Sequence, residues 1–239
     1  MSRTSTTLKT MKKNYKTIFI IVLTLAAAGI GPNLFVIAQA GYGNLSNLAL
    51  DYLLPSIFAL LIAYLLTSVF ELNDLRRVIK NGAIGGFLAT IGLEVVREIG
   101  FRLGTMPGEL PQLMGVLLLN RFAEGPNLLS NIAGWSYHFW NGAAFGIIYG
   151  VIIGKGQVWF GTIFGFLVGI GFMMSPVVVA LGIGRFGTEF GVGFPITVTA
   201  AHIAFGTILG WFNHRYNGAG TGIIPVLRSI FDSRQETQT

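Results

Sequence analysis

Long apolar runs recur along this chain, separated by short polar stretches. Several of the runs are near 20 residues, which is about the length that crosses a bilayer core as an α-helix. The alternating pattern of about 10 residues per strand that outer-membrane barrels show is absent. We therefore predict an all-α, polytopic membrane protein with six transmembrane helices, at about residues 17–40, 47–70, 79–100, 131–154, 157–181 and 195–213.

Three prolines, Pro32, Pro55 and Pro176, fall inside the first, second and fifth predicted helices. Kinks at such positions are tolerated in spanning helices when neighbouring groups satisfy the freed backbone carbonyls. The first run follows a lysine-rich stretch, as a signal peptide would, but it is longer than a typical signal-peptide core. We therefore interpret the first run as a spanning helix.

Lys and Arg residues gather on one side of the predicted bundle. If the N-terminus is cytoplasmic, 12 of the 16 lie on that side, including every Lys, and the other four are Arg97, Arg102, Arg121 and Arg185. Basic residues are enriched in the cytoplasmic loops of membrane proteins. This bias predicts a bacterial inner-membrane protein with both termini cytoplasmic.

The same topology divides the chain into a single transmembrane domain, 17–213, between cytoplasmic tails at 1–16 and 214–239. The net charge of +6 belongs to this arrangement. The expected partner is therefore the lipid bilayer, and a nucleic-acid partner is not predicted.

The composition narrows the chemistry further. Charged residues make up 11% of the chain, against roughly 25% in an average soluble domain. The absence of cysteine excludes disulfides, thiolate metal sites and thiol redox chemistry. No G-x-S-x-G or Walker motif occurs, and no predicted span contains the lysine that a retinal Schiff base needs. An enzymatic function is therefore not favoured.

An internal repeat links the third and fourth helices to the fifth and sixth. GAIGGFLATIG (82–92) and GTIFGFLVGIG (161–171) agree at seven of eleven positions, and HFWNGAAFG (138–146) resembles HIAFGTILG (202–210). Both pairs start on the cytoplasmic side, so the predicted repeat is parallel, with an axis along the membrane normal. Glycine at every fourth position lets helix backbones approach closely and requires no ligand. The repeat units are about 79–154 and 157–213.

Polar residues are predicted to converge in the outer half of this bundle. Glu94, Arg97 and Glu98 lie at i, i+3 and i+4 and share a helix side. His138 and His202 each lie about seven residues, or roughly 10 Å, below the outer end of a helix. The candidate ligand-binding residues are Glu94, Arg97, Glu98, His138, Asn141 and His202.

Two interpretations of these residues stay open. A charge at the bilayer centre costs on the order of 3 kcal/mol, so ionisable residues inside spans are candidate functional sites. Alternatively, Arg97 pairs with the neighbouring glutamates to join the third helix to the outer loop, and the histidines bond to nearby carbonyls. The functional interpretation is the one we carry forward as a hypothesis.

The longest connection, residues 101–130, is predicted to lie outside the membrane. Its segment LPQLMGVLLLNRF is amphipathic but too short to span, so we predict an interfacial or re-entrant helix there. This loop either roofs the polar layer or only covers helix ends. In the first case the residues predicted to ring the entrance are Arg121, Glu124, Arg185 and Glu189.

The succession of GAIGGFLAT, GWSYHFWNGAAFGIIYG, the mid-span Pro176 and AAHIAFGTILGW resembles the YagU-like family of small bacterial multi-pass inner-membrane proteins. The resemblance covers about residues 80–213 and depends on glycine and histidine spacing. It implies the same membrane location and the same repeat. It implies no settled chemistry, and neither EVVRE nor MPGELPQLMG is part of it.

Three functions fit these patterns. The first is a site for a small ligand, an ion or protons, with transport as an extension. The second is a haem or transition-metal redox subunit, in which His138 and His202 are axial haem ligands or bind a metal together with Glu94. The third is a structural or assembly subunit of a homo-oligomer or a larger membrane complex, which the glycine stripes and aromatic faces would suit. The sequence leaves the ligand and any cofactor unidentified.

Overall fold

In the computed structural model, residues 2–218, 222 and 223 are described, with side chains from Tyr15 onward. This part of the chain is helical throughout, without a strand, which confirms the predicted all-α fold. Much of the predicted C-terminal tail, residues 219–221 and 224–239, lies outside the described residues. The predicted N-terminal tail is not separate from the first helix, because that helix begins at Ser2.

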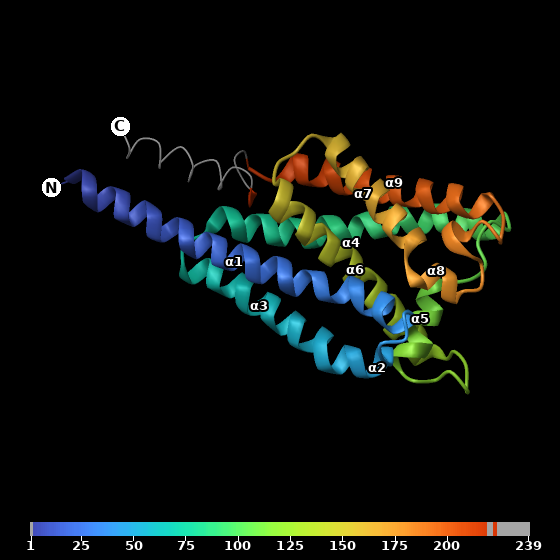
Figure 1. Cartoon of the computed structure of the whole chain (residues 1–239). Helices are drawn as coiled ribbons and strands as arrows, with labels where there is room; N and C mark the ends of the chain where they lie inside the picture. The colour runs from blue at the N-terminus through green and yellow to red at the C-terminus, as the bar shows by residue number, and fades with distance from the viewer. Residues whose placement is uncertain (1, 219–221, 224–239) are drawn as a thin grey trace.

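The long helices lie side by side in an elongated bundle, with α5 and α8 at one end and the beginning of α1 at the other (Figure 1). The helical elements are α1 (Ser2–Gln39), α2 (Leu45–Leu48), the π-helical η1 (Ala49–Leu53), α3 (Leu54–Val69), α4 (Asn73–Arg102), α5 (Leu110–Leu118), α6 (Leu128–Ile153), α7 (Val158–Met174), α8 (Pro176–Ala180), the 3₁₀ turn η2 (Arg185–Gly187) and α9 (Gly193–Tyr216).

Two of the prolines change the predicted helices. The second helix widens into η1 immediately before Pro55, where the ring would otherwise meet the carbonyl of Asp51. The fifth predicted helix, 157–181, is two helices, because Ser175 has an extended backbone (φ −74°, ψ 159°) between α7 and α8. The Ser175 hydroxyl accepts a hydrogen bond from the Val177 amide at 3.3 Å and so caps α8.

Among the described residues, three helical stretches are long and apolar enough to cross a membrane, Tyr15–Gln39, Leu45–Val69 and Gly193–Tyr216. Val158–Met174 is apolar but shorter. Two other predicted spans are less apolar, because α4 carries charges at both ends and in its outer third, and α6 interleaves glycine with Ser, Asn and His. The apolar helices are compatible with a membrane protein.

The helices pack in a definite order. From one side of the bundle to the other, α7 contacts α9, α9 contacts α4, α4 contacts α6, α6 contacts α1, and α1 contacts α3. The short α5 packs on α6, with Gly115 against the Ser130 carbonyl. Predicted as a short helix in the outer loop, α5 is thus a helix held against the bundle.

Glycines set two close helix crossings, α4–α6 and α7–α9, and both crossings use the same arrangement. In the α4–α6 crossing a Cβ at Gly86 would meet the Gly142 carbonyl, and Gly146 fits against Gly82 and Gly86. In the α7–α9 crossing a Cβ at Gly165 would meet the His202 carbonyl, and Gly206 fits against Gly161 and Gly165. Small residues at such crossings let backbones touch.

This arrangement shifts the predicted alignment of His138 with His202 by one helical turn. Gly142 takes the position in the first crossing that His202 takes in the second. Eight residues before the central glycines, Gly146 and Gly206, stand His138 and Val198 respectively. His138 and His202 therefore take positions one turn apart in the two crossings, although they stand 10 and 9 residues after the first residues of α6 and α9.

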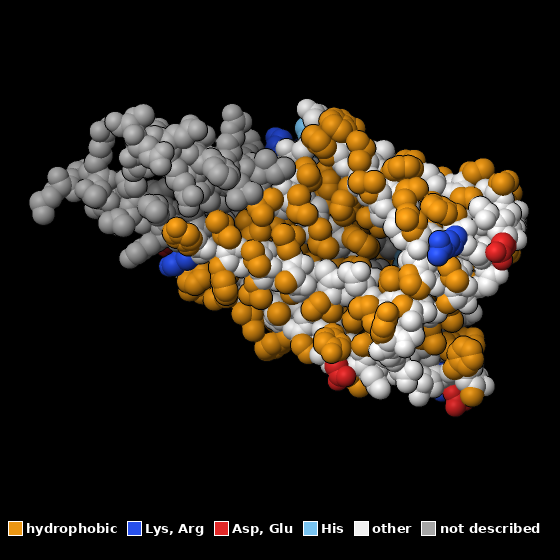
Figure 2. Space-filling view, viewed as in Figure 1, with side chains coloured by type: hydrophobic (Ala, Val, Ile, Leu, Met, Phe, Trp, Pro, Cys, Tyr) orange, Lys and Arg blue, Asp and Glu red, His pale blue; other side chains and the backbone are white. Residues whose placement is uncertain are grey.

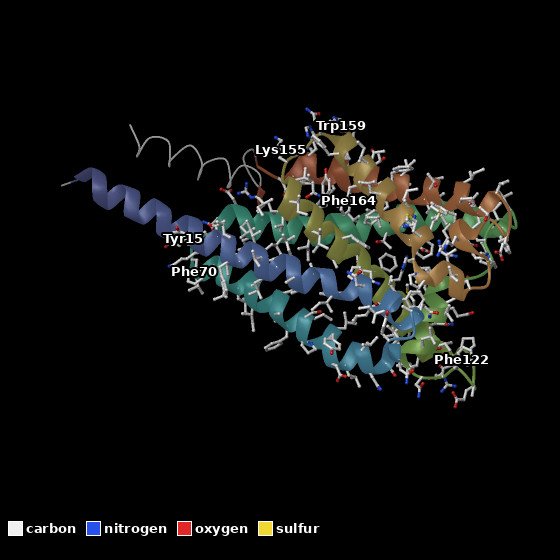
Figure 3. All side chains as sticks on the ribbon, viewed as in Figure 1. Tyr15, Phe70, Phe122, Lys155, Trp159 and Phe164 are labelled. Carbon is white, nitrogen blue, oxygen red and sulfur yellow. The ribbon has the colours of Figure 1, made fainter. Side chains whose placement is uncertain are left out.

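The surface of the bundle is apolar along its length. Figure 2 shows hydrophobic side chains over the middle of the visible face, with most of the charged ones toward its ends. Figure 3 places Tyr15, Phe70, Lys155 and Trp159 toward one end and Phe122 toward the other. Aromatic side chains at both ends of an apolar belt are typical of the two membrane–water interfaces.

Candidate functional site

A cavity of about 600 Å³ lies in the half of the bundle that contains α5 and α8. Its walls come from α1, α4, α6, α7 and α9, and the segment Met106–Leu110 and α5 close its end. Aromatic rings form much of the apolar wall, including Phe145, Phe172 and Phe205. Cavities of this size with a few polar groups are typical of small-molecule sites.

Three ionisable side chains meet on one side of this cavity. Arg97 Nε donates to Glu94 Oε2 at 2.7 Å, and His138 Nε2 lies 2.9 Å from Glu94 Oε1. Glu94 and Arg97 lie at i and i+3 on α4, so they are neighbours on one face. The α4–α6 glycine crossing brings His138 close to them.

Several polar atoms of this cluster lack an aligned hydrogen bond. They are Glu94 Oε1, His138 Nε2, Arg97 Nη1 and Asn141 Oδ1, all buried and all on residues that line the cavity. Glu94 is 9% exposed, Arg97 6% and Asn141 8%. Leaving one buried donor or acceptor unpaired costs about 1–3 kcal/mol. The cavity is thus bordered by residues with buried polar atoms, of which Arg97 Nη1 and Asn141 Oδ1 have no hydrogen-bond partner and Glu94 Oε1 and His138 Nε2 contact each other.

His202 lines the same cavity from α9 but is held differently. Its Nδ1 lies 2.8 Å from the Val198 carbonyl of the preceding turn, and its ring stacks on Phe172 at 6.0 Å between centroids. Gly169 makes room for the imidazole, because a Cβ there would meet His202 Cβ at 2.9 Å. His202 therefore contributes a fixed aromatic wall with Nε2 as its remaining polar atom.

Other predicted site residues lie elsewhere. Glu98 does not line the cavity and instead accepts a hydrogen bond from Arg102 Nε at 2.8 Å on the surface. Of the four predicted entrance residues, Arg185 borders a separate surface pocket with Gln39 and Met174. None of the four lines the main cavity. The other three predicted entrance residues are Arg121, Glu124 and Glu189.

The cavity also includes residues that the sequence reasoning missed. The exposed Glu109 lines its end, in the turn that precedes α5, and the exposed Asn33 lines it from α1. The turn signal in MPGELP was visible in the sequence, but nothing there indicated that Glu109 faces a cavity. Asn33 stands alone among apolar residues one position after Pro32, which is the signal that could have identified it.

The predicted three-residue metal site is not assembled. Among residues 2–218, 222 and 223, no three His, Cys, Asp or Glu side chains are grouped so that they could hold a metal ion. The predicted metal ligands His138, His202 and Glu94 are therefore not grouped in this way. His138 Nε2 contacts Glu94, and His202 Nδ1 lies 2.8 Å from the Val198 carbonyl, while the haem interpretation stays a prediction.

The α7–α9 crossing places apolar residues where the α4–α6 crossing has charged ones. Eight residues after Gly86 stands Glu94, and eight after Gly165 stands Met173. Met173 is buried with Val198 in one hydrophobic cluster, just as Glu94 meets His138. A crossing of this geometry therefore closes without charged groups.

Comparison with known proteins identified no relative of this chain. No family model matches it, and neither do curated proteins or solved structures. The chemistry of the cavity is therefore argued from its own residues, and membership of the YagU-like family stays a prediction.

Proposed function

We propose that this chain is a multi-pass protein of the bacterial inner membrane that binds a small ligand in the cavity between α1, α4, α6, α7 and α9. Glu94, Arg97, His138 and Asn141 supply the polar contacts, and His202 and the phenylalanines supply the wall. The observation that carries the proposal is the buried Glu94–Arg97–His138 cluster on the cavity lining, beside which Arg97 Nη1 and Asn141 Oδ1 have no hydrogen-bond partner.

The α7–α9 crossing argues that this polar cluster serves binding more than folding. Met173 and Val198 fill the positions of Glu94 and His138 there without any charge. Replacing a buried ion pair by packed apolar residues is often neutral or stabilising. Charged groups that packing does not require, next to a cavity, are the expected form of a ligand site.

The cavity shape favours binding over passage. Its deepest lining residues are near Phe145, about two-thirds of the way along α6, and Phe205, about midway along α9. The opposite half of the bundle closes on clusters such as Val78, Ile147 and Val151. Binding in a one-ended cavity is therefore the proposed function, and transport would require a further conformation.

The proposal also includes six spans, a parallel repeat and cytoplasmic termini. The six long helical stretches lie side by side, and the two glycine crossings share one arrangement, which supports a repeat of 79–154 and 157–213. The ends of α1 and α9 that carry Lys16 and Arg215 lie at the same end of the bundle as Lys155 (Figures 1 and 3). This clustering supports the predicted orientation.

Native mass spectrometry of the protein, purified from its own membranes in mild detergent, tests the proposal. We expect a small-molecule adduct on the wild-type chain. We expect the adduct to disappear from the triple variant Glu94→Met/Arg97→Leu/His138→Val, which adopts the apolar side chains of the α7–α9 crossing at positions 94 and 138 and removes the remaining charge.

The matched control is Glu98→Gln/Arg102→Gln, which removes the neighbouring exposed ion pair on the same helix. This control should retain the adduct. A wild-type chain with no adduct, or a triple variant with the same adducts as the wild type, would contradict the proposal. Thermal unfolding of each variant in the same detergent distinguishes loss of binding from loss of folding.

A further inference from the structure

The cavity opens sideways, between α1 and α7. α1 packs on α6 and α3 and touches α8, but it does not pack along α7. Asn33 of α1 and Gly171 of α7 both line the cavity and are both exposed on the outside of the bundle. A hollow is visible on this face in Figure 2, near the place where Figure 1 shows α7 passing α1. We call this gap, lined by Asn33 and Gly171, the lateral opening.

The lateral opening lies within the apolar length of the bundle. Asn33 is six residues before Gln39, the last residue of α1, which is about 9 Å along a helix. Large apolar side chains next to the opening are exposed, including Leu167, Met174 and Val179. In the proposed membrane orientation, the lateral opening therefore meets the acyl chains of the outer leaflet.

The polar cluster inside selects a particular kind of headgroup. Glu94 and Arg97 form an ion pair in which their charges balance. Arg97 Nη1 is a free donor and Asn141 Oδ1 is a free acceptor, whereas Glu94 Oε1 contacts His138 Nε2 at 2.9 Å. A neutral hydroxyl or carbonyl headgroup can satisfy both kinds of atom, whereas a carboxylate would add an unbalanced negative charge beside Glu94.

From these features, and resting on the proposed function, we infer that the ligand is an amphipathic lipid with a neutral, hydroxyl- or carbonyl-bearing headgroup. It enters from the membrane through the lateral opening. Its headgroup binds Arg97 Nη1 and Asn141 Oδ1, beside the Glu94–His138 contact. Its chain lies against Phe145, Phe172 and Phe205 and leaves toward the bilayer between α1 and α7.

Gly171 provides a way to close the lateral opening. No atom lies within 4 Å of the Cβ that Gly171 lacks, so a side chain can start there without meeting the backbone. Gly171→Trp is therefore expected to fold and to obstruct the opening. Leu167→Trp is the matched control, because Leu167 is 59% exposed one turn away on the same helix and does not line the cavity.

The probe is 1-oleoylglycerol carrying a photoactivatable diazirine in its acyl chain, offered to the protein in phosphatidylcholine nanodiscs. We expect crosslinks on peptides that contain Phe145, Phe172 or Phe205. Loss of one charged hydrogen bond, about 1.5–3 kcal/mol, corresponds to roughly tenfold or more in affinity. Labelling should fall at least about tenfold in the Glu94→Met/Arg97→Leu/His138→Val variant and in Gly171→Trp, but not in Leu167→Trp.

Several outcomes would overturn the inference. They are crosslinks confined to the outer faces of the helices, undiminished labelling of Gly171→Trp, and preferential cavity labelling by the matched diazirine oleate, which has a carboxylate. A native adduct identified as a water-soluble molecule without an acyl chain would refute the lipid and leave the proposed function standing. If the protein carried no native adduct and the cavity were not labelled, both the proposed function and the lipid inference would be refuted.

Discussion

Glu94 contacts two side chains, Arg97 and His138, that have few other polar partners. Its two oxygens contact Arg97 and His138 at 2.7 and 2.9 Å, and Arg97 is only 6% exposed. Removing one member of a buried charge pair is more costly than replacing all members, because the remaining charge stays buried without compensation. The energetic role of Glu94 can therefore be separated from its proposed binding role.

Glu94→Ala should destabilise the protein by about 3–5 kcal/mol, because it leaves Arg97 buried without a counter-ion. The triple variant Glu94→Met/Arg97→Leu/His138→Val should lie within about 1.5 kcal/mol of the wild type, as apolar packing replaces the pair. Reversible unfolding in mixed detergent micelles measures both. Equal destabilisation of the single and triple variants would show that the cluster is mainly structural.

The sequence predicted this cluster in part. The spacing of Glu94 and Arg97 and the polar character of His138 and Asn141 were sufficient to predict that these four side chains lie together. Glu98 was misplaced because successive residues on a helix are about 100° apart, so Glu98 turns away when Arg97 faces the cavity. The entrance residues lie in loops, where no periodicity indicates the direction of a side chain.

At the scale of helices, the two glycine crossings differ in which helix supplies the larger side chain. In the α4–α6 crossing Thr90 of α4 lies against Gly142 of α6. In the α7–α9 crossing the order is reversed, with Gly169 of α7 against His202 of α9. Each crossing therefore has a glycine at this level on one of its two helices. Aligning the sequences by His138 and His202 consequently placed the two crossings one turn out of register.

Gly142→Ala should destabilise the protein by about 1–3 kcal/mol, because its methyl group would meet Thr90 Oγ1. Adding Thr90→Gly should restore part of the loss, at a helix-propensity cost of about 1 kcal/mol. Gly29→Ala is the control. It has open space around the new methyl group and should be neutral or stabilising by up to about 1 kcal/mol.

Thermal unfolding of these purified variants measures the differences. Failure of Thr90→Gly to rescue Gly142→Ala would mean that the two helices are not in the register described. The register itself was beyond the sequence, because a four-residue glycine period leaves the crossing ambiguous by whole turns. The division of the fifth helix at Ser175 was likewise ambiguous, since proline permits either a kink or a break.

For the whole molecule, the proposed orientation rests on the distribution of basic residues. Lys16, Arg76 and Arg215 lie near the end of the bundle where α4 begins and α9 ends, and Lys155 lies there too (Figure 3). The end with α5 has fewer basic side chains. Each basic residue near an anionic membrane surface contributes about 1 kcal/mol, so several together are enough to fix an orientation.

Single cysteines test this orientation directly, because the native chain has none. Tyr42 and Phe122 are 82% and 77% exposed in loops at the α5 end, and Lys155 is exposed in the loop at the opposite end. In intact spheroplasts a membrane-impermeant charged maleimide should label Tyr42→Cys and Phe122→Cys within minutes. Lys155→Cys should react only after the membrane is permeabilised, and the cysteine-free native chain should not react at all.

The opposite labelling pattern would invert the molecule and move the cavity to the cytoplasmic half of the membrane. The ion-paired cluster, its unpaired polar atoms and the gap between α1 and α7 would be unchanged, because they follow from the helix packing alone. The lateral opening would then face the inner leaflet, and lipids of that leaflet would reach Glu94 and Arg97. Labelling at Lys155 therefore decides from which side of the bilayer the proposed ligand comes.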